Sequence, residues 1–156
     1  MPKQRPPGLD RAHSHAIIKC MSRANTWLYK VSGGRFGARF LAGAPVLLLT
    51  TTGRKSGLQR TQPVLYLVDD ERLVIVASKA GMAKNPMWYL NLSANPDVKA
   101  QIGDAERAYT ARTASAEEKA KLWPRLVAMY PDFDSYQSWT ERDIPVVILD
   151  ASQTGP

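Results

Sequence analysis

The chain has few of the side chains that most enzymes use for catalysis. Its 156 residues include one cysteine, Cys20, and two histidines, His13 and His15, both near the N-terminus. A single cysteine cannot form an internal disulfide and is typical of a reducing cytoplasm. The sequence offers no His/Cys cluster for a metal ion and no Ser/His/Asp set spread along the chain. We therefore expect no metal site and no hydrolase triad, and we expect any catalysis to depend on a bound cofactor.

Long apolar runs are also missing. No stretch approaches the roughly 18 residues of a membrane-spanning helix, and the N-terminal M-P-K-Q-R-P-P-G lacks the hydrophobic segment of a signal peptide. Hydrophobic residues make up 44% and charged residues 22%, which is a globular composition. We expect a flexible arm over residues 1–12, a single domain over residues 13–150 and a short tail over residues 151–156, in a cytoplasmic protein.

Positive charge is in excess. Lysine and arginine outnumber aspartate and glutamate by 21 to 14, a net charge of +7 that favours anionic ligands, anionic lipid or nucleic acid without choosing among them. Residues 13–31 have apolar side chains every three or four positions, with Lys19, Arg23 and Lys30 outside the apolar stripe. This spacing predicts an amphipathic helix, which either covers the core or contacts the inner surface of the cell membrane.

The densest cluster of cations lies between two apolar runs. Residues 50–60 read T-T-T-G-R-K-S-G-L-Q-R, which predicts a hairpin with a long loop. The cations are Arg54, Lys55 and Arg60, and the glycines are Gly53 and Gly57. We expect both glycines at positive φ, with backbone N–H groups pointing inward. Such a loop binds a phosphodiester or polycarboxylate, or it is simply a solvated basic hairpin tip. The glycine spacing excludes a phosphate-binding P-loop.

A second stretch, residues 76–91, reads V-A-S-K-A-G-M-A-K-N-P-M-W-Y-L-N. Small side chains at Ala77 and Ser78 would let a flat ring approach the backbone, and Lys79 adds a positive charge. Asn85 is expected to cap a helix whose first N–H groups also favour an anion. An ordinary strand–loop–helix connection is the alternative.

Aromatic residues gather in a third stretch. They are Trp123, Tyr130, Phe133, Tyr136 and Trp139. Pro131 predicts that a helix breaks within this group. The cluster is either a mobile lid over a planar substrate or the packing of C-terminal helices against the rest of the domain.

The pattern of apolar runs and turn residues predicts an α+β fold with about six mostly antiparallel strands in a barrel and helices outside it. The strands are expected at residues 45–52, 60–68, 72–78, 98–102, 107–112 and 145–149. One helix should follow Asn85-Pro86 and stop at Asn95-Pro96. Another should begin with a capping box, Ser115 with Glu118, and run to about Met129.

The ordered set of these motifs closely resembles the deazaflavin-dependent nitroreductase family. The segments are K-C-M-S-R-A-N-T-W-L-Y, T-T-T-G-R-K-S-G with R-T-Q-P-V, A-S-K-A-G-M-A-K-N-P-M-W-Y-L-N-L-S-A-N-P, W-P-R-L-V-A-M-Y-P and S-Y-Q-S-W-T-E-R-D-I-P-V-V. The resemblance implies a split β-barrel that binds coenzyme F420, an 8-hydroxy-5-deazaflavin with a phosphate-linked oligoglutamate tail. It also implies hydride transfer from C5 of the reduced ring to a small-molecule acceptor: a quinone, an activated enone or a nitroaromatic, with quinone reduction as the physiological reaction.

The resemblance also implies which residues form the site. The anionic tail would contact Arg54, Lys55, Ser56 and Arg60. The ring would lie against Thr61, Gln62, Pro63, Val64, Leu65, Val76, Ala77, Ser78, Lys79, Met87, Trp88, Tyr89, Leu90 and Asn91. Ser78 and Lys79 would also lie at the reaction centre, with Tyr130, Tyr136 and Phe133 forming the acceptor pocket. Members of the family that activate bicyclic nitroimidazoles have tyrosines where Leu65 and Phe133 stand here, which puts that activity in doubt.

Two other function classes fit the same residues. FMN also has a phosphate and a three-ring system, so an FMN-binding split barrel is the nearest alternative. A non-enzymatic barrel that binds nucleic acid or another anion is the second, with the loop on phosphates and the aromatic residues on bases. Against nucleic acid, the aromatic residues lie far along the chain from the cationic loop, in segments with helix-capping residues.

Overall fold

The computed structural model describes residues 44–152. The predicted arm over residues 1–12 and the predicted helix over residues 13–31, with its expected membrane contact, lie outside the described residues. Across the part of the chain that is described, no helix combines the length and the apolar character needed to cross a bilayer.

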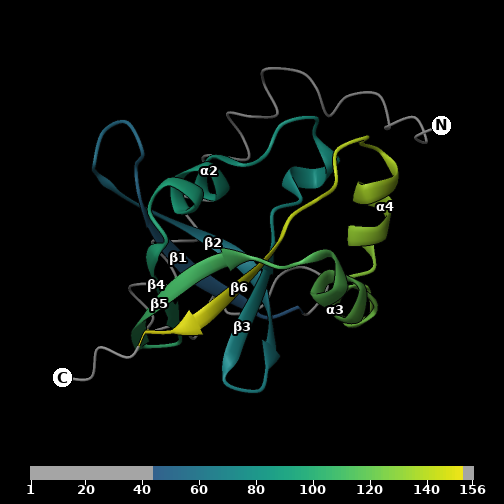
Figure 1. The fold of residues 1–156 in the computed structure, drawn as a ribbon. Coiled ribbons are helices and arrows are strands. Elements are labelled where there is room, and N and C mark those ends of the chain that lie inside the picture. Colours follow the sequence, from purple (N-terminus) through teal and green to yellow (C-terminus); the bar gives the residue numbers. More distant parts are fainter. Residues whose placement is uncertain (1–43, 153–156) are drawn as a thin grey trace.

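Six strands close into a barrel in the order β1-β2-β3-β6-β5-β4, with β4 pairing back onto β1 (Figure 1). Every neighbouring pair is antiparallel. The strands are β1 (Val46–Thr52), β2 (Gln59–Asp69), β3 (Arg72–Val76), β4 (Asp97–Ile102), β5 (Ala105–Thr113) and β6 (Val146–Ala151). This confirms the predicted α+β barrel, and β6 crosses the domain boundary predicted at residue 150.

The third strand is shorter than predicted. It ends at Val76 instead of Ser78, because Lys79 and Ala80 have φ angles of 44° and 50°. These angles are in the left-handed region, which no strand residue adopts. The chain instead makes a short 3-10 turn, η1 (Lys79–Gly81), before helix α2 (Met87–Ala94).

Apolar side chains fill the inside of the barrel, and α2 covers this interior core. Alternate residues of the strands point inward, as the two-residue period of a strand requires. The interior cluster contains Leu47, Leu49, Leu73, Ile75, Ala77, Val98, Ala100, Tyr109, Ala111, Val147 and Leu149, together with Trp88 and Leu92 of α2. Helix α2 is therefore anchored on the barrel through two of its own side chains.

The outer faces of β3 and β6 form a second core with helices α3 (Ala116–Met129) and α4 (Asp132–Ser138). Val74 and Val76 of β3 and Val146 and Ile148 of β6 point outward into this core, which includes Leu122 and Leu126 of α3. Each fully buried aliphatic side chain contributes roughly 1.5–3 kcal/mol. Because both faces of residues 73–76 and 146–149 are buried, these parts of β3 and β6 are apolar without interruption.

The predicted helix ends are confirmed with one exception. Helix α2 stops at Ala94, before Asn95-Pro96, and α3 runs to Met129. The Ser115–Glu118 capping box opens α3 as predicted, and α4 starts after Pro131. Asn85, however, does not cap α2. The residue before that helix is Pro86, which makes no side-chain capping bond, and Asn85 Oδ1 accepts a hydrogen bond from Arg142 instead (2.8 Å).

Ion pairs attach α3 to the barrel. Arg112 of β5 donates two hydrogen bonds to Glu118 at the start of α3 (2.8 and 3.0 Å) and one to Asp150 of β6 (3.0 Å). Asp69 at the end of β2 accepts from Arg125 of α3 at 2.7 Å. The hydrogen bonds from Arg112 and from the Ser115 backbone lower the pKa of Glu118 from 4.5 to about 2.

Changing Glu118 to Gln should lower the melting temperature at pH 7. A carboxylate with a depressed pKa stabilises the folded state above its unfolded pKa, and this contribution is lost as the pH falls toward the folded value. The difference between Glu118→Gln and the parent chain should therefore shrink between pH 4.5 and pH 2. The control is Glu117→Gln, because Glu117 is 86% exposed and has only a 3.9 Å contact to Lys121. A pH-independent difference would contradict this account of the network.

Candidate functional site

The loop between β1 and β2, residues 53–58, projects beside α2 (Figure 1). Hydrogen bonds from Gly53 N to Leu58 O and from Gly57 N to Gly53 O, both 2.8 Å, fold it on itself. Gly57 has the predicted positive φ, 71°, whereas Gly53 does not. A Cβ at Gly53 would lie 2.6 Å from Ser56 Oγ and 3.2 Å from the Leu58 carbonyl oxygen, so a side chain there would require Ser56 to move.

The glycine N–H groups of this loop do not point toward a ligand, contrary to our expectation, because both are bonded within the loop. The N–H groups of Lys55 and Ser56, at the tip, have no hydrogen-bond acceptor among residues 44–152. The donors that remain for an anion are therefore these two backbone groups and the side chains around them.

The three predicted cations of the loop are exposed and unneutralised. Arg54, Lys55 and Arg60 all have exposed side chains. None of them makes an ion pair with a carboxylate in the described part of the chain. The arginines around α3 are bound to Asp69, Glu118 and Asp150, whereas the cations of this loop carry unneutralised positive charge.

Asn91 connects the loop to α2. Its side chain is 6% exposed, its Oδ1 accepts from Arg54 N at 3.2 Å, and its Nδ2 donates to Thr51 Oγ1 at 3.5 Å. Asn91 was predicted as a direct ligand of the ring, but both ends of its amide face protein groups. Its position instead fixes the orientation of the cationic loop relative to α2.

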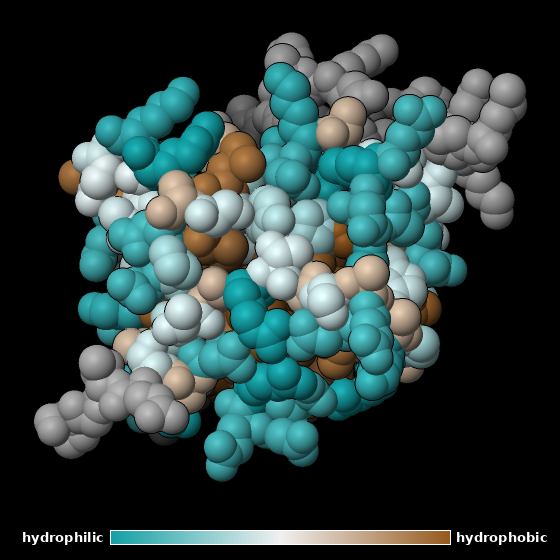
Figure 2. Space-filling view, viewed as in Figure 1, coloured by the Kyte–Doolittle hydropathy of each residue, from teal (hydrophilic) through white to brown (hydrophobic). Residues whose placement is uncertain are grey.

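The residues predicted to contact a ring differ in exposure. Three of them, Val76, Ala77 and Trp88, are buried in the two cores and pack beneath the exposed residues of the site. The partly or fully exposed ones are Thr61, Gln62, Pro63, Val64 and Leu65 of β2, Ser78 before η1, Lys79 of η1, and Met87, Tyr89 and Leu90 of α2. Figure 2 shows hydrophobic residues at the surface around α2, among hydrophilic ones. Met87, the first residue of α2, is 57% exposed.

The connection from β3 to α2 is held in a conformation that side chains usually avoid. Lys79 and Ala80 have positive φ, as does Gly81 at 69°. Non-glycine residues in this region cost roughly 1–3 kcal/mol each and persist only where neighbouring groups hold them. Gly81 is buried against α4, and a Cβ at this position would lie 2.7 Å from the Tyr136 carbonyl oxygen. This close approach brings the segment 76–91 next to the aromatic residues of the C-terminal helices.

Arg142 is a residue of this region that the sequence analysis missed. Its guanidinium is half-buried and donates to the backbone carbonyls of Ala77, Ser78 and Met82 and to the side chain of Asn85. It precedes β6 in a polar stretch that resembles an ordinary loop. The only sequence signal was its place in the family segment T-E-R-D-I-P-V-V, which specified no partner.

The aromatic residues form one cluster beside η1. Tyr130 and Phe133 are 8% and 3% exposed, and their rings meet edge to face with centroids 5.0 Å apart. Tyr136 is half-buried, and its hydroxyl lies 3.2 Å from that of Tyr130. Burial and this hydrogen bond raise the pKa of Tyr130 well above its usual value, so its hydroxyl is neutral. Packing against the barrel therefore describes Tyr130 and Phe133, and the half-buried Tyr136 is the least buried member of the predicted acceptor pocket.

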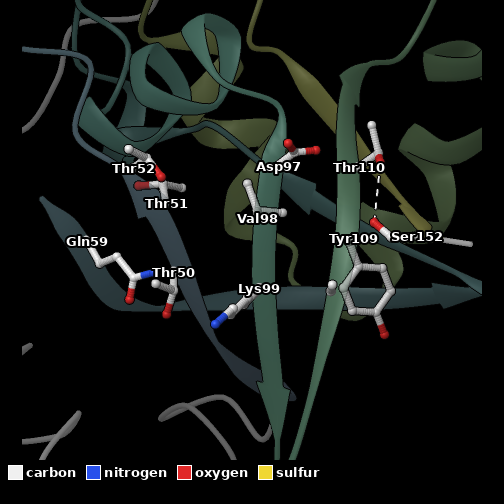
Figure 3. A pocket seen from close by; sticks show the side chains of 11 residues that line it. Thr50, Thr51, Thr52, Gln59, Asp97, Val98, Lys99, Tyr109, Thr110 and Ser152 are labelled. Carbon is white, nitrogen blue, oxygen red and sulfur yellow. Dashed lines mark hydrogen bonds between the residues drawn. The ribbon is translucent and has the colours of Figure 1, made fainter. Parts of the chain in front are cut away.

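A cavity of about 630 Å³ adjoins the base of the cationic loop (Figure 3). Its walls are Thr50, Thr51, Thr52, Gln59, Asp97, Val98, Lys99, Ala108, Tyr109, Thr110 and Ser152. None of the predicted binding residues lines it. Asp97 and Lys99 balance in charge, and Lys99 lies 3.9 Å from Glu106, so this cavity lacks the excess positive charge of the neighbouring loop.

The family model for F420H(2)-dependent quinone reductases matches residues 21–151, which include every segment of the site. The chain belongs to this family. It is 52% identical over 115 residues to Rv3178 of Mycobacterium tuberculosis, across 74% of this chain and 97% of that protein. It is 38% identical over 130 residues to the F420H(2)-dependent quinone reductase Rv1261c of the same organism, across 81% and 87%.

A solved structure of an F420-H2 dependent reductase, FDR-A, is 42% identical to this family member. The alignment covers 68% of this chain and 94% of that one, with a TM-score of 0.63. The match supports the split-barrel fold expected from the motifs.

Replacing Gly81 by Ala tests the contact between η1 and α4. Gly81 and Gly57 have nearly equal φ angles, 69° and 71°, but a Cβ at Gly57 would meet nothing within 4 Å. Both variants incur the backbone cost of about 1–2 kcal/mol, and only Gly81→Ala adds a clash with Tyr136. Chemical denaturation should show a larger loss of unfolding free energy for Gly81→Ala, by about 1–3 kcal/mol. Equal losses would mean that α4 is not tightly packed on η1.

Proposed function

We propose that this chain reduces quinones with reduced coenzyme F420 as the hydride donor, and that the cationic loop, η1, α2 and the aromatic cluster form the site. The observation that carries this proposal is the set of three exposed cations with no carboxylate partner among the described residues. They are joined through Asn91 to a helix whose outer face is apolar.

The loop fits the anionic tail of the coenzyme. Arg54, Lys55 and Arg60 supply positive charge, and the N–H groups of Lys55 and Ser56 supply two donors. Charge-assisted hydrogen bonds to phosphate or carboxylate oxygens are stronger than neutral ones. A tail that carries several negative charges would therefore bind where the fold has left positive charge free.

The flat ring of the coenzyme fits the surface next to this loop. Residues 61–65 of β2 and the exposed side chains of α2 offer apolar contact, and Ser78 and Lys79 offer polar groups at the end of β3. The bound coenzyme supplies a hydride and thus two electrons. The protein's part is to hold donor and acceptor roughly 3–3.5 Å apart and correctly oriented. No side chain needs to act as a nucleophile.

Tyr136 is placed to act on the acceptor. It is half-buried beside η1, and its hydroxyl is within hydrogen-bond distance of the Tyr130 hydroxyl. When Tyr130 donates to Tyr136 and not to the neighbouring Asp132 carboxylate, the Tyr136 hydroxyl can donate to the oxygen on which charge develops during quinone reduction. Tyr130 then orients Tyr136, and Phe133 packs behind both rings.

The same cluster argues against nucleic acid as the ligand. Base stacking needs exposed aromatic faces beside the cations. Tyr130 and Phe133 are buried instead, and Tyr136 and Trp139 pack on each other with centroids 5.6 Å apart.

Calorimetric titration of the protein with coenzyme F420 and, separately, with FMN tests the proposal. We expect saturable binding of coenzyme F420 and much weaker binding of FMN, which lacks the oligoglutamate tail. Oxidation of the reduced coenzyme should then accelerate when a quinone such as menadione is added. Tighter binding of FMN would replace this proposal with the flavin alternative.

Changing Lys55 or Arg60 to Ala should weaken coenzyme binding about tenfold. A hydrogen bond to a charged group contributes about 1.5–3 kcal/mol, and solvent screening at this exposed loop reduces that value. The loss should be smaller for coenzyme with fewer glutamates. The control is Lys121→Ala, which removes the same charge from a 79% exposed site on α3. Equal affinities in the parent and both loop variants would exclude this loop as the tail site.

Changing Tyr136 to Phe should lower kcat for menadione by about tenfold or more with little change in the dissociation constant of the coenzyme, because the hydroxyl acts mainly as charge develops. Tyr130→Phe should have a smaller effect, since Tyr130 acts through Tyr136. Steady-state kinetics and coenzyme titration of both variants provide the measurement. If Tyr136→Phe keeps full turnover, another group must serve the acceptor oxygen.

A further inference from the structure

The side chain of Arg142 donates hydrogen bonds from four of its five N–H groups. Three acceptors are backbone carbonyls between Ala77 and Met82, and the fourth is the side chain of Asn85. Nε donates to Met82 O at 2.8 Å, and Nη2 donates to Ser78 O at 2.7 Å. Nη1 donates to Ala77 O at 3.2 Å and to Asn85 Oδ1 at 2.8 Å. One planar group thus fixes the two ends of η1 relative to each other.

All four acceptors are neutral. Arg142 makes no ion pair with a carboxylate in the described part of the chain. The guanidinium is half-buried, and this burial lowers the pKa of Arg142 because desolvation disfavours the charged form. Four hydrogen bonds offset the cost of burying this charge, and an apolar side chain at the same position would leave the four acceptors without their donor.

The direction of these bonds determines where the backbone N–H groups point. In a trans peptide, the C=O and the N–H of the same unit point in opposite directions. The carbonyls of Ala77 and Ser78 face Arg142, so the N–H groups of Ser78 and Lys79 face away from it. Neither N–H has an acceptor among residues 44–152, while Gly81 N and Met82 N close the turn onto Ser78 O and Lys79 O.

We propose that Arg142 is a positioning residue of the coenzyme site. It holds the strained residues Lys79 and Ala80 in place so that the N–H groups of Ser78 and Lys79 are directed at the polar edge of a bound deazaflavin ring, whose carbonyl oxygens accept both hydrogen bonds. This inference rests on the proposed function. Arg142 lies on the opposite side of this segment from the ring, so it would contribute to ring binding only by positioning the backbone.

The fork shape of the guanidinium, and not only its charge, is required. A lysine ammonium at this position keeps the charge but presents its donors from a single point, so it cannot span acceptors from Ala77 to Asn85. Arg142→Lys should therefore impair ring binding although the net charge is unchanged. Asn85→Ala is a milder variant that leaves Arg142 in place and removes one of its four acceptors.

The experiment compares two ligands: coenzyme F420 and the ring-only 8-hydroxy-5-deazaflavin, which has no phosphate or glutamate. Calorimetric titration of Arg142→Lys should show about tenfold weaker binding of both ligands, as expected for the loss of two hydrogen bonds. Asn85→Ala should weaken both by about threefold. Arg125→Lys is the matched control, since Arg125 clamps Asp69 and the Val68 carbonyl outside the site. It should leave both affinities unchanged.

A second measurement uses the ligand-free protein. Hydrogen exchange of the Gly81 and Met82 amides, which close the turn onto Ser78 O and Lys79 O, should be faster in Arg142→Lys than in the parent, with exchange in α3 unchanged. Faster exchange with unchanged affinity for the ring-only ligand would overturn the proposal and leave Arg142 a structural role. If Arg142→Lys does not fold, the affinity of Asn85→Ala for the ring-only ligand tests the proposal. An affinity equal to that of the parent chain would overturn the proposal as well.

These outcomes are separable from failure of the proposed function. A parent chain that binds neither ligand would refute the coenzyme assignment and this inference with it. Loss of coenzyme affinity in Lys55→Ala, together with unchanged ring-only affinity in Arg142→Lys and Asn85→Ala, would refute the role of Arg142 alone.

Discussion

The pairing of β3 with β6 is the constraint on which the rest of the site depends. Both strands are buried on both faces, so their register is fixed by two cores at once. The last rungs join Val76 to Val146 and Ala77 N to Pro145 O at 2.9 Å. The segment that follows β3 and the segment that precedes β6 must therefore lie side by side where they join the two strands. Arg142 meets Ser78 for this reason, although the two are 64 residues apart in sequence.

A second connection extends the site from this point to the cationic loop. Helix α2 is anchored on the interior core by Trp88 and Leu92, and its buried Asn91 bonds the first cation-bearing residue of the loop, Arg54. The loop, α2 and η1 thus form a continuous series of contacts, with the aromatic cluster attached through Gly81 and Tyr136. Anchoring flexible segments on rigid elements is what lets a site hold two small molecules in a fixed relation.

Features governed by local sequence could be predicted. The strands follow from apolar runs and the start of α3 from the Ser115–Glu118 pair, because strand period and helix capping act within a few residues. The errors lie where a distant residue intervenes. Asn85 has the chemistry of a helix cap but bonds Arg142, and the third strand ends early because η1 is held by contacts from the C-terminal part of the chain. Gly53 was predicted at positive φ but does not adopt it.

The candidate site shows the same division between local and distant information. The cations at and beside the loop lie close together in sequence, so their role could be inferred from the motif. The role of Arg142 could not be inferred in this way, because the carbonyls that it binds come next to it only after the barrel closes. The two kinds of contact also differ in their response to salt. Exposed cations that bind an anionic tail are screened by added salt, whereas neutral hydrogen bonds from a clamped backbone to a ring are not. Raising the ionic strength should therefore weaken the tail contribution and leave the ring contribution in place, which separates the two halves of the site within the unmodified protein.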